Sequence, residues 1–542
     1  MKTPAALEMA ATDYQPIEGA RLAVPLTFRD AWPYWSLPAV LALALALAFL
    51  NPFIGDWDGL DYTVLSVRGN PSSMALGRTL FIFFNHALYR GAHFLFGVTA
   101  ADAYLIFKYA VVVQSPLAVI ASWILARDLT NSVRAATVSA VLVAVSPVFV
   151  LYSGQVMTDV PSVLLVALAL TIYLRGAQRR HTWLLFAGAL VLGAGVNVRE
   201  TTAFYASWLV VAPLVCGWRI GRREVGLIAM VLIVFFIVAI SGFAGWYLLD
   251  PVYRQSWHIW LASMHDEAAL HPVTFNNVLP FIVFFFLTAP LVFVALPVAV
   301  WKEWRARSFT PLLGCATVGL LANLLLFFNY STAVNWRYFL TGLPALAPLV
   351  GCYFVSSETQ RLRSRRWGFI SALLGPVLIT GLLVVLVRPT SSDHFNKLAV
   401  ARDYYARLAT LPRDAVVMAG SQTVAVTYWQ GIGAGEWEVI GIGGGWPGAQ
   451  LNTVIENHLS KGRRVFLDAD PRWWQPCGWR AQELPTLVGL ESRFHFQRVS
   501  ETIFEIKDAR DASAGDQPHL ENLLPEYRPV DVKKCFGVGK GQ

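Results

Sequence analysis

The chain has 542 residues, of which 56% are hydrophobic and only 14% are charged, whereas soluble domains contain about 25% charged residues. This composition excludes a typical soluble enzyme and indicates an integral membrane protein. The formal net charge is +8, but most arginines lie in short loops between apolar runs, which indicates membrane topology and no nucleic-acid partner.

The first apolar run, residues 34–52, follows a polar tail, residues 1–30, that lacks the regions of a removable signal peptide. We therefore expect the tail to be retained and the run to form a spanning helix. About 20 apolar residues cross the roughly 30 Å of hydrocarbon in a bilayer, and residues 31–390 predict a polytopic α-helical domain of about eleven spans. The other ten runs cover residues 102–126, 133–151, 160–175, 182–198, 201–218, 225–249, 278–301, 309–329, 335–356 and 367–388.

Basic residues alternate from loop to loop along this series. Every second loop is rich in arginine or lysine, as in "RGAQRRH" and "QRLRSRRW", whereas the intervening loops have few, and "YSGQVMTD" has none. Because basic loops face the cytoplasm, we expect the N-terminus to be cytoplasmic. With an odd number of spans, the C-terminus is then expected outside.

The first loop expected outside is long, covering residues 53–101, and opens with "GDWDGLDYT". It continues with a stretch, residues 74–98, that is apolar yet carries scattered basic side chains. These are Arg78, His86, Arg90 and His93. The mixture predicts an amphipathic helix pair lying in the membrane interface rather than a span.

The sequence pattern changes after about residue 390. The segments "DAVVMAG", "WEVIGIGG" and "RRVFLDAD" are typical of buried strands, and "LNTVIENHLSKG" and "AQELPTLVGL" are typical of helices between them. This alternation predicts an extracytoplasmic α/β domain with a mainly parallel sheet over residues 391–510, followed by a polar tail, residues 511–542. Outside the cytoplasm, Cys477 and Cys535 either form a disulfide or stay free, and the sequence leaves both open.

Three aspartates, Asp56, Asp58 and Asp61, lie where the chain leaves the first span. Carboxylates beside a bilayer are costly unless they are hydrated or paired, so they are functional candidates. In an extended segment, Asp56 and Asp58 would share a face and could hold a divalent cation or activate a hydroxyl; the alternative is a solvated acidic loop. Asp159, at the outer end of the fourth span, is either a helix N-cap or a second carboxylate of the same site.

Arginines on the outer side oppose the charge bias of the topology. Arg199 follows the fifth span next to Glu200, where it pairs locally, contacts a lipid headgroup or contributes to a site. Arg78, Arg254 and Arg337 are the other outer arginines near the membrane surface. Each alone is compatible with an interfacial side chain, but together they could neutralise a phosphate, because guanidinium groups form forked hydrogen bonds to phosphate oxygens.

Two weaker motifs favour structural roles. "GIGGGWPG" (residues 441–448) lacks the spacing and the lysine of a phosphate-binding loop and predicts a turn. His86 and His93 would share a helix face, but a zinc site needs a third ligand, which the sequence does not supply. No cofactor is required, and a divalent cation stays an open alternative.

In their order along the chain, these motifs resemble the GT-C superfamily of polyprenyl-phosphate-sugar glycosyltransferases, which includes protein O-mannosyltransferases and bacterial aminoarabinose transferases. The resemblance covers about residues 30–390. It rests on the acidic motif and amphipathic stretch of the first outer loop, on "MTDVPSVLLVALALTIYL" and on "RYFLTGLPALAPLVG". A C-terminal extracytoplasmic α/β domain is also common in the family.

The resemblance implies inverting transfer of a sugar from a polyprenyl phosphate to a hydroxyl of a protein, lipid or envelope glycan, at the outer face of a bacterial or archaeal plasma membrane. "DWDGLDY" matches the family's D-E-A-x-Y pattern, which implies that Asp58 is the general base and that Tyr62 belongs to the site. Gly59 stands where the family often has Glu, which leaves Asp56 as the second carboxylate. Arg78 falls where relatives often have Lys or His beside prolines, and is implied to bind the donor phosphate.

Other functions stay open. Within glycosyl transfer, the alternative is a polymerase or ligase that uses a diphosphate-linked glycan. A transporter or lipid flippase would place polar residues at mid-membrane on broken helices, often with inverted repeats. Here the charged residues gather at one face, and the sequence has no evident repeat.

Overall fold

The computed structural model describes residues 30–51, 53–54, 57–73, 76–270, 278–305, 310–327, 336–361, 406–419, 428–433, 436–441, 448–468 and 489–508. Several predictions lie outside these residues. They concern Asp56, the eleventh apolar run, both cysteines of the C-terminal region, and nearly all of the two terminal tails.

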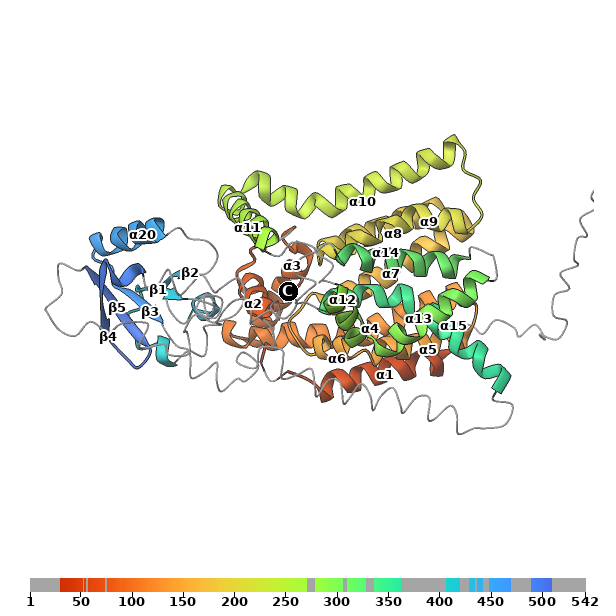
Figure 1. The fold of residues 1–542 in the computed structure, drawn as a ribbon, viewed down its shortest axis with the longest axis horizontal. Helices are drawn as coiled ribbons and strands as arrows, with labels where there is room; N and C mark the ends of the chain where they lie inside the picture. Colours follow the sequence, from red (N-terminus) through yellow and green to blue (C-terminus); the bar gives the residue numbers. More distant parts are fainter. Residues whose placement is uncertain are drawn as a thin grey trace, which may run out of the picture.

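Most of the described chain is a bundle of roughly parallel and antiparallel helices (Figure 1). The helices of the bundle are α1 (Trp32–Ala48), α4 (Ala103–Thr130), α5 (Val133–Ala144), α6 (Pro147–Ser153), α7 (Asp159–Arg179), α8 (Thr182–Val196), α9 (Trp208–Val215), α10 (Arg222–Leu249), α12 (Val278–Thr288), α13 (Pro290–Arg305), α14 (Pro311–Phe327) and α15 (Leu343–Arg361). Short 3₁₀ helices precede three of them: η1 (Ala100–Asp102), η2 (Glu200–Ser207) and η5 (Trp336–Gly342).

The first ten predicted runs each fall on one helix or on a pair of consecutive helices. Within the described residues, four helices are long and apolar enough to cross a membrane, and six spans result if each of two bent pairs counts as one. The pairs α5–α6 and α12–α13 bend by 63° and 106°. Each bend precedes a proline, Pro147 or Pro290, which restricts the residue before it. The total of eleven spans stays a prediction.

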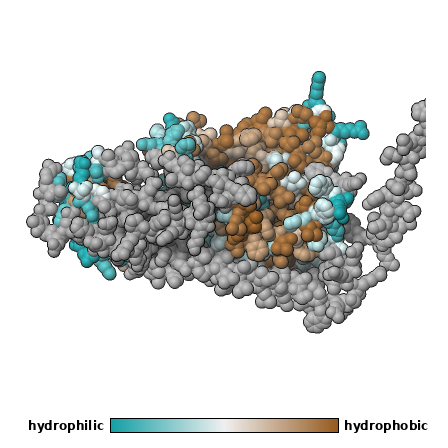
Figure 2. Space-filling view, in the orientation of Figure 1, coloured by the Kyte–Doolittle hydropathy of each residue, from teal (hydrophilic) through white to brown (hydrophobic). Residues whose placement is uncertain are grey.

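Helix α7 is at the centre of the bundle and α10 at its edge. Of the apolar window of α7, 72% is buried, against 17% for α10. The exposed side chains of α10 include Ile233, Phe236 and Ile237, and hydrophobic residues gather over the bundle on the face shown in Figure 2. An apolar helix that is exposed along its length suits contact with lipid.

Three further helices lie at one end of the bundle: α2 (Trp57–Arg68), α3 (Thr79–Phe96) and α11 (Pro251–Leu270) (Figure 1). The first outer loop therefore does form a helix pair, but its members differ from the prediction. The apolar stretch, residues 74–98, supplies only α3, and the acidic stretch is helical from Trp57 onward rather than extended.

Gly59 allows α2 to begin where it does. A Cβ atom at this position would lie 2.7 Å from Ile54 Cγ2 and 3.0 Å from the carbonyl oxygen of Val156. A side chain fits there only if Ile54 moves and the Val156 carbonyl gives way slightly. This contact explains why Glu is absent from the position that it often holds in the family.

The C-terminal region contains a five-stranded sheet with α20 (Gly448–Ser460) against it. Its strands are β1 (Val416–Ala419), β2 (Glu438–Gly441), β3 (Val465–Asp468), β4 (Phe494–Arg498) and β5 (Ile503–Asp508), in the order β2-β1-β3-β5-β4. The β1 strand pairs in parallel with β2 and β3, whereas β5 is antiparallel to β3 and β4. The prediction of a mainly parallel sheet is thus wrong, because the β4–β5 hairpin was missed.

Candidate active site

Asp58 lies in the first turn of α2 and is the centre of a cluster of charged side chains. Its Oδ2 atom accepts a hydrogen bond from Arg337 Nη2 at 2.5 Å and a longer one from the Tyr62 hydroxyl at 3.4 Å. Arg78 Nη1 lies 3.8 Å from the same oxygen. Residues from α2, from η5 and from the turn before α3 therefore meet at one carboxylate.

Arg78 connects this carboxylate to a second one. It occupies a left-handed backbone conformation, with φ of 46°, directly before α3. Its Nη2 atom donates to Glu200 Oε1 at 3.3 Å, and its guanidinium group lies 5.1 Å from the centre of the Tyr62 ring. The side chain of Arg78 is only 6% exposed, so its charge is held by these partners rather than by water.

A third ion pair, Arg199 with Asp159, adds to the pairs Arg337–Asp58 and Arg78–Glu200, and it is fully buried. Arg199 Nη1 is 2.8 Å from Asp159 Oδ1 and donates to the Thr158 hydroxyl at 3.1 Å. Asp159 is the first residue of α7, and Thr158 holds the N-cap position, so the alternative that Asp159 caps the helix is wrong. The ring of Tyr338 stacks with Arg199 at 4.7 Å and lies 5.8 Å from Arg337, which joins this pair to the Asp58 cluster.

The predicted local pair between Arg199 and Glu200 does not form, because each residue pairs with a more distant one. Sequence reasoning also missed Tyr338 and Thr158. Tyr338 directly follows Arg337 in "NWRYFLTG", and an aromatic residue beside an arginine was the signal that could have identified it.

Buried charges set the protonation states in the first outer loop. Burial by itself raises the pKa of Asp58, but the guanidinium groups of Arg337 and Arg78 outweigh it and hold this pKa below its usual value. Asp61 lies one turn further along α2. Burial, together with the negative charge of Asp58, raises its pKa to about 7. Asp58 is therefore ionised at neutral pH, whereas Asp61 is close to half protonated.

Several buried donors and acceptors of this site have no hydrogen-bond partner among the described residues. They are Nε and Nη1 of Arg78, Nε and Nη2 of Arg199, Oδ2 of Asp159, and Oε2 of Glu200. Buried polar groups are normally satisfied, and a guanidinium nitrogen can only donate. The unused donors of Arg78 and Arg199 therefore suit a bound anion.

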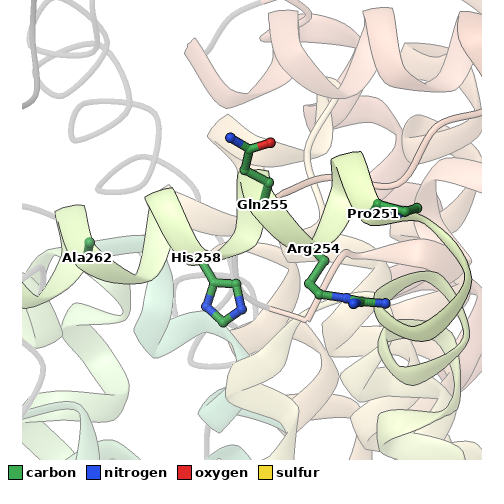
Figure 3. Close-up of a pocket in the computed structure, with 5 residues that line it drawn as sticks. All are labelled: Pro251, Arg254, Gln255, His258 and Ala262. Atoms are coloured by element: carbon green, nitrogen blue, oxygen red, sulfur yellow. The ribbon is translucent and has the colours of Figure 1, made fainter. Parts of the chain in front are cut away.

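Arg254, the fourth predicted phosphate ligand, is not part of this cluster. It lies on α11 and donates to the carbonyl oxygens of Tyr247 and Leu248, at 2.9 and 3.1 Å, where α10 ends. With His258 it points to one side of α11, away from Gln255, and lines an open hollow of about 460 Å³ (Figure 3). Its two donor contacts give it a helix-capping role.

His86 also lies apart from the site. Its Nδ1 is 2.8 Å from the carbonyl oxygen of Ser66, so it joins α3 to the end of α2. His93 Nδ1 is 2.8 Å from the carbonyl oxygen of Val98 at the end of its own helix. Across the described part of the chain, no three His, Cys, Asp or Glu side chains gather as metal ligands would.

Comparisons with known proteins agree on the fold. Residues 84–263 match the family described as dolichyl-phosphate-mannose-protein mannosyltransferase. This region includes Asp159, Arg199 and Glu200 but not Asp58, Arg78 or Arg337. No curated protein matches the chain.

Solved structures match over nearly the whole chain. The apo structure of ArnT from Cupriavidus metallidurans has 13% identity and a TM-score of 0.50, covering 88% of this chain and 98% of its own. The same protein bound to undecaprenyl phosphate has 12% identity and a TM-score of 0.53, covering 90% and 100%. The apo oligosaccharyltransferase of Archaeoglobus fulgidus has 12% identity and a TM-score of 0.50, covering 90% and 75%. The chain therefore has the fold of ArnT and of the oligosaccharyltransferase, and the resemblance to the GT-C superfamily is confirmed.

Proposed function

We propose that this chain is a membrane glycosyltransferase that moves a sugar from a polyprenyl phosphate to an acceptor hydroxyl, with inversion, at the extracytoplasmic face. The observation that carries the proposal is the group of three buried arginines, Arg78, Arg199 and Arg337, at one end of an apolar bundle. Two of them, Arg78 and Arg199, hold unused donors beside carboxylate side chains. A lipid-linked phosphate has the charge and the apolar tail that this combination fits.

The arrangement supports a simple substitution. The acceptor oxygen forms a bond to the anomeric carbon while the bond from that carbon to the phosphate oxygen breaks. Asp58 takes the proton of the acceptor hydroxyl as general base. The arginines stabilise the charge that develops on the departing polyprenyl phosphate. Asp159, buried against Arg199, holds that guanidinium group in place rather than reaching the reacting atoms.

Phosphate binding would also make Asp58 a stronger base. Arg337 and Arg78 lower the pKa of this carboxyl. The donor is a phosphodiester with one negative charge, and its phosphate gains a second charge as the bond to the sugar breaks. This developing charge competes for the same guanidinium groups and adds negative charge beside Asp58, and both effects raise the pKa of Asp58. The departing phosphate would therefore strengthen the base when the acceptor must lose its proton.

We infer the side of the membrane on which the site lies from the charges along α7. This helix begins at Asp159 and ends at Arg179, which places the two residues about 30 Å apart at 1.5 Å per residue. The arginine end belongs to the basic loops, which face the cytoplasm by the positive-inside rule. The Asp159 end, with the rest of the charged cluster, then faces the outside.

Transfer from radiolabelled polyprenyl-phosphate sugars, with envelope extract as acceptor, tests the proposal. We expect the wild-type protein to release polyprenyl phosphate and to label the acceptor, and Asp58→Asn to abolish both. Asp128→Asn is a matched control, because Asp128 also pairs with an arginine, Arg175 at 2.5 Å, away from the Asp58 cluster. Full transfer by Asp58→Asn would disprove the role of Asp58, and labelled lipid that moves across vesicles without release of sugar would favour a flippase.

A further inference from the structure

A single helical turn of the C-terminal region, residues 428–431, packs against the helix that carries Asp58. Gly431 lies against Val64 of α2, and a Cβ atom on Gly431 would be 2.9 Å from Val64 Cγ2. Val64 is 2% exposed, so it has no free space to move into. The position requires glycine because its backbone lies directly against the side chain of Val64.

The same turn also holds the chain that leads into α2. The ring of Tyr428 meets the ring of Phe53 edge-on, with ring centres 5.8 Å apart, and Phe53 packs against Tyr104 of α4 at 5.0 Å. Lys108 of α4 donates to the carbonyl oxygens of Asn51 and Phe53, at 2.9 and 3.1 Å. Phe53, just before the acidic segment, is thus held between α4 and the C-terminal region.

Hydrogen bonds also connect this helical turn to the sheet. Gln430 donates to the carbonyl oxygen of Trp437, the residue before β2. The indole of Trp437 is fully buried and donates to the carbonyl oxygen of Pro412, before β1, at 3.0 Å. A continuous set of contacts therefore runs from the sheet through Tyr428 and Gly431 to α2.

We propose that the C-terminal region positions α2, through Tyr428 and Gly431, and so fixes where Asp58 lies relative to Arg337 and Arg78. The inference rests on the proposed function and adds positioning residues to it. Asp58 and Arg337 are in close contact at 2.5 Å, and a general base must be within hydrogen-bond reach of its proton. A displacement of about 1 Å at a reacting group can lower the rate on the order of 100-fold.

Three variants test the contact between the turn and α2. Gly431→Ala should push α2 away, and Val64→Ala should leave room for the added methyl group in the double variant. Gly489→Ala is the control, since a Cβ atom there would have none of the described residues within 4 Å. Because the arginines are untouched, we expect Gly431→Ala to lower kcat by about 10- to 100-fold with KM for the donor changed by less than about 3-fold, and the double variant to recover most of the kcat.

The outcomes separate this inference from the proposed function. Wild-type kcat in Gly431→Ala, or an equal loss in the single and double variants, would overturn the positioning role while leaving the glycosyltransferase intact. If the wild type transfers no sugar, the proposed function fails, and hydrogen exchange of the α2 amides still decides the contact. Exchange should be faster in Gly431→Ala and should return to the wild-type rate when Val64→Ala is added; unchanged exchange in Gly431→Ala would refute the contact.

Discussion

The ion pair of Asp159 and Arg199 gives the most quantitative prediction about the site. Its side chains are 0% and 1% exposed, with 2.8 Å between Oδ1 and Nη1. At an effective dielectric constant of about 20, two charges at this distance attract by about 6 kcal/mol, most of which offsets the loss of hydration of both ions. The pair as a whole therefore adds little stability, whereas the loss of one partner is costly.

Asp159→Asn keeps the shape of the side chain and removes its charge. Arg199 would keep a single hydrogen bond, to the Thr158 hydroxyl, and the charge of Glu200 nearby would compensate it in part. Breaking one side of a buried pair costs about 3–5 kcal/mol, and we expect the lower end of this range, about 3 kcal/mol. The double variant with Arg199→Gln carries neither charge and should recover at least half of the loss.

Denaturant unfolding in detergent, followed by tryptophan fluorescence, measures these differences in a double-mutant cycle. For a buried pair, we expect the two single losses to be strongly non-additive in the double variant. Single losses below about 1 kcal/mol, or losses that simply add in the double variant, would show that the two residues are not a buried pair.

Three further predictions concern the first outer loop. The raised pKa of Asp61 means that its contribution to stability is complete below about pH 4 and is lost as the pH rises to about 7. Asp61→Asn should therefore stabilise the protein at pH 8, by on the order of 4 kcal/mol, and not at pH 4, as measured by unfolding at both values. Lys108→Met leaves two buried carbonyl groups without their donor and should lower the unfolding free energy by about 2–3 kcal/mol, with Lys108→Arg closer to wild type. Gly59→Ala forces a methyl group against Ile54 and should cost about 1–3 kcal/mol and reduce transfer, and an unchanged melting temperature would argue against the close contact.

The sequence predicted the helices well because their signals are local. Apolar runs set the position of ten helices or helix pairs, and Pro147 and Pro290 mark two bends that the hydropathy pattern alone does not show. The β4–β5 hairpin was missed although "FHFQR" alternates apolar and polar residues and "IFEIKD" contains three apolar residues. The alternation in "FHFQR" was the available signal, but the preceding segments predicted a continuing strand–helix pattern.

The pairing of the site residues is not a local property. Topology placed the acidic and basic candidates on one side, but Arg337 lies 279 positions from Asp58. It comes near through the packing of η5 against several helices, among them α7, α12 and α14. Adjacency in the sequence did not predict the ion pairs either. Arg199 and Glu200 are adjacent, yet their partners, Asp159 and Arg78, come from two other elements.

An experimental structure with bound polyprenyl phosphate tests the central claim most directly. We expect phosphate oxygens within about 2.7–3.2 Å of guanidinium nitrogens of Arg78 and Arg199, with Asp58 beside the same phosphate and the lipid tail against the apolar helices. A phosphate bound at Arg254 on α11, with the Asp58–Arg337 pair still closed, would contradict it.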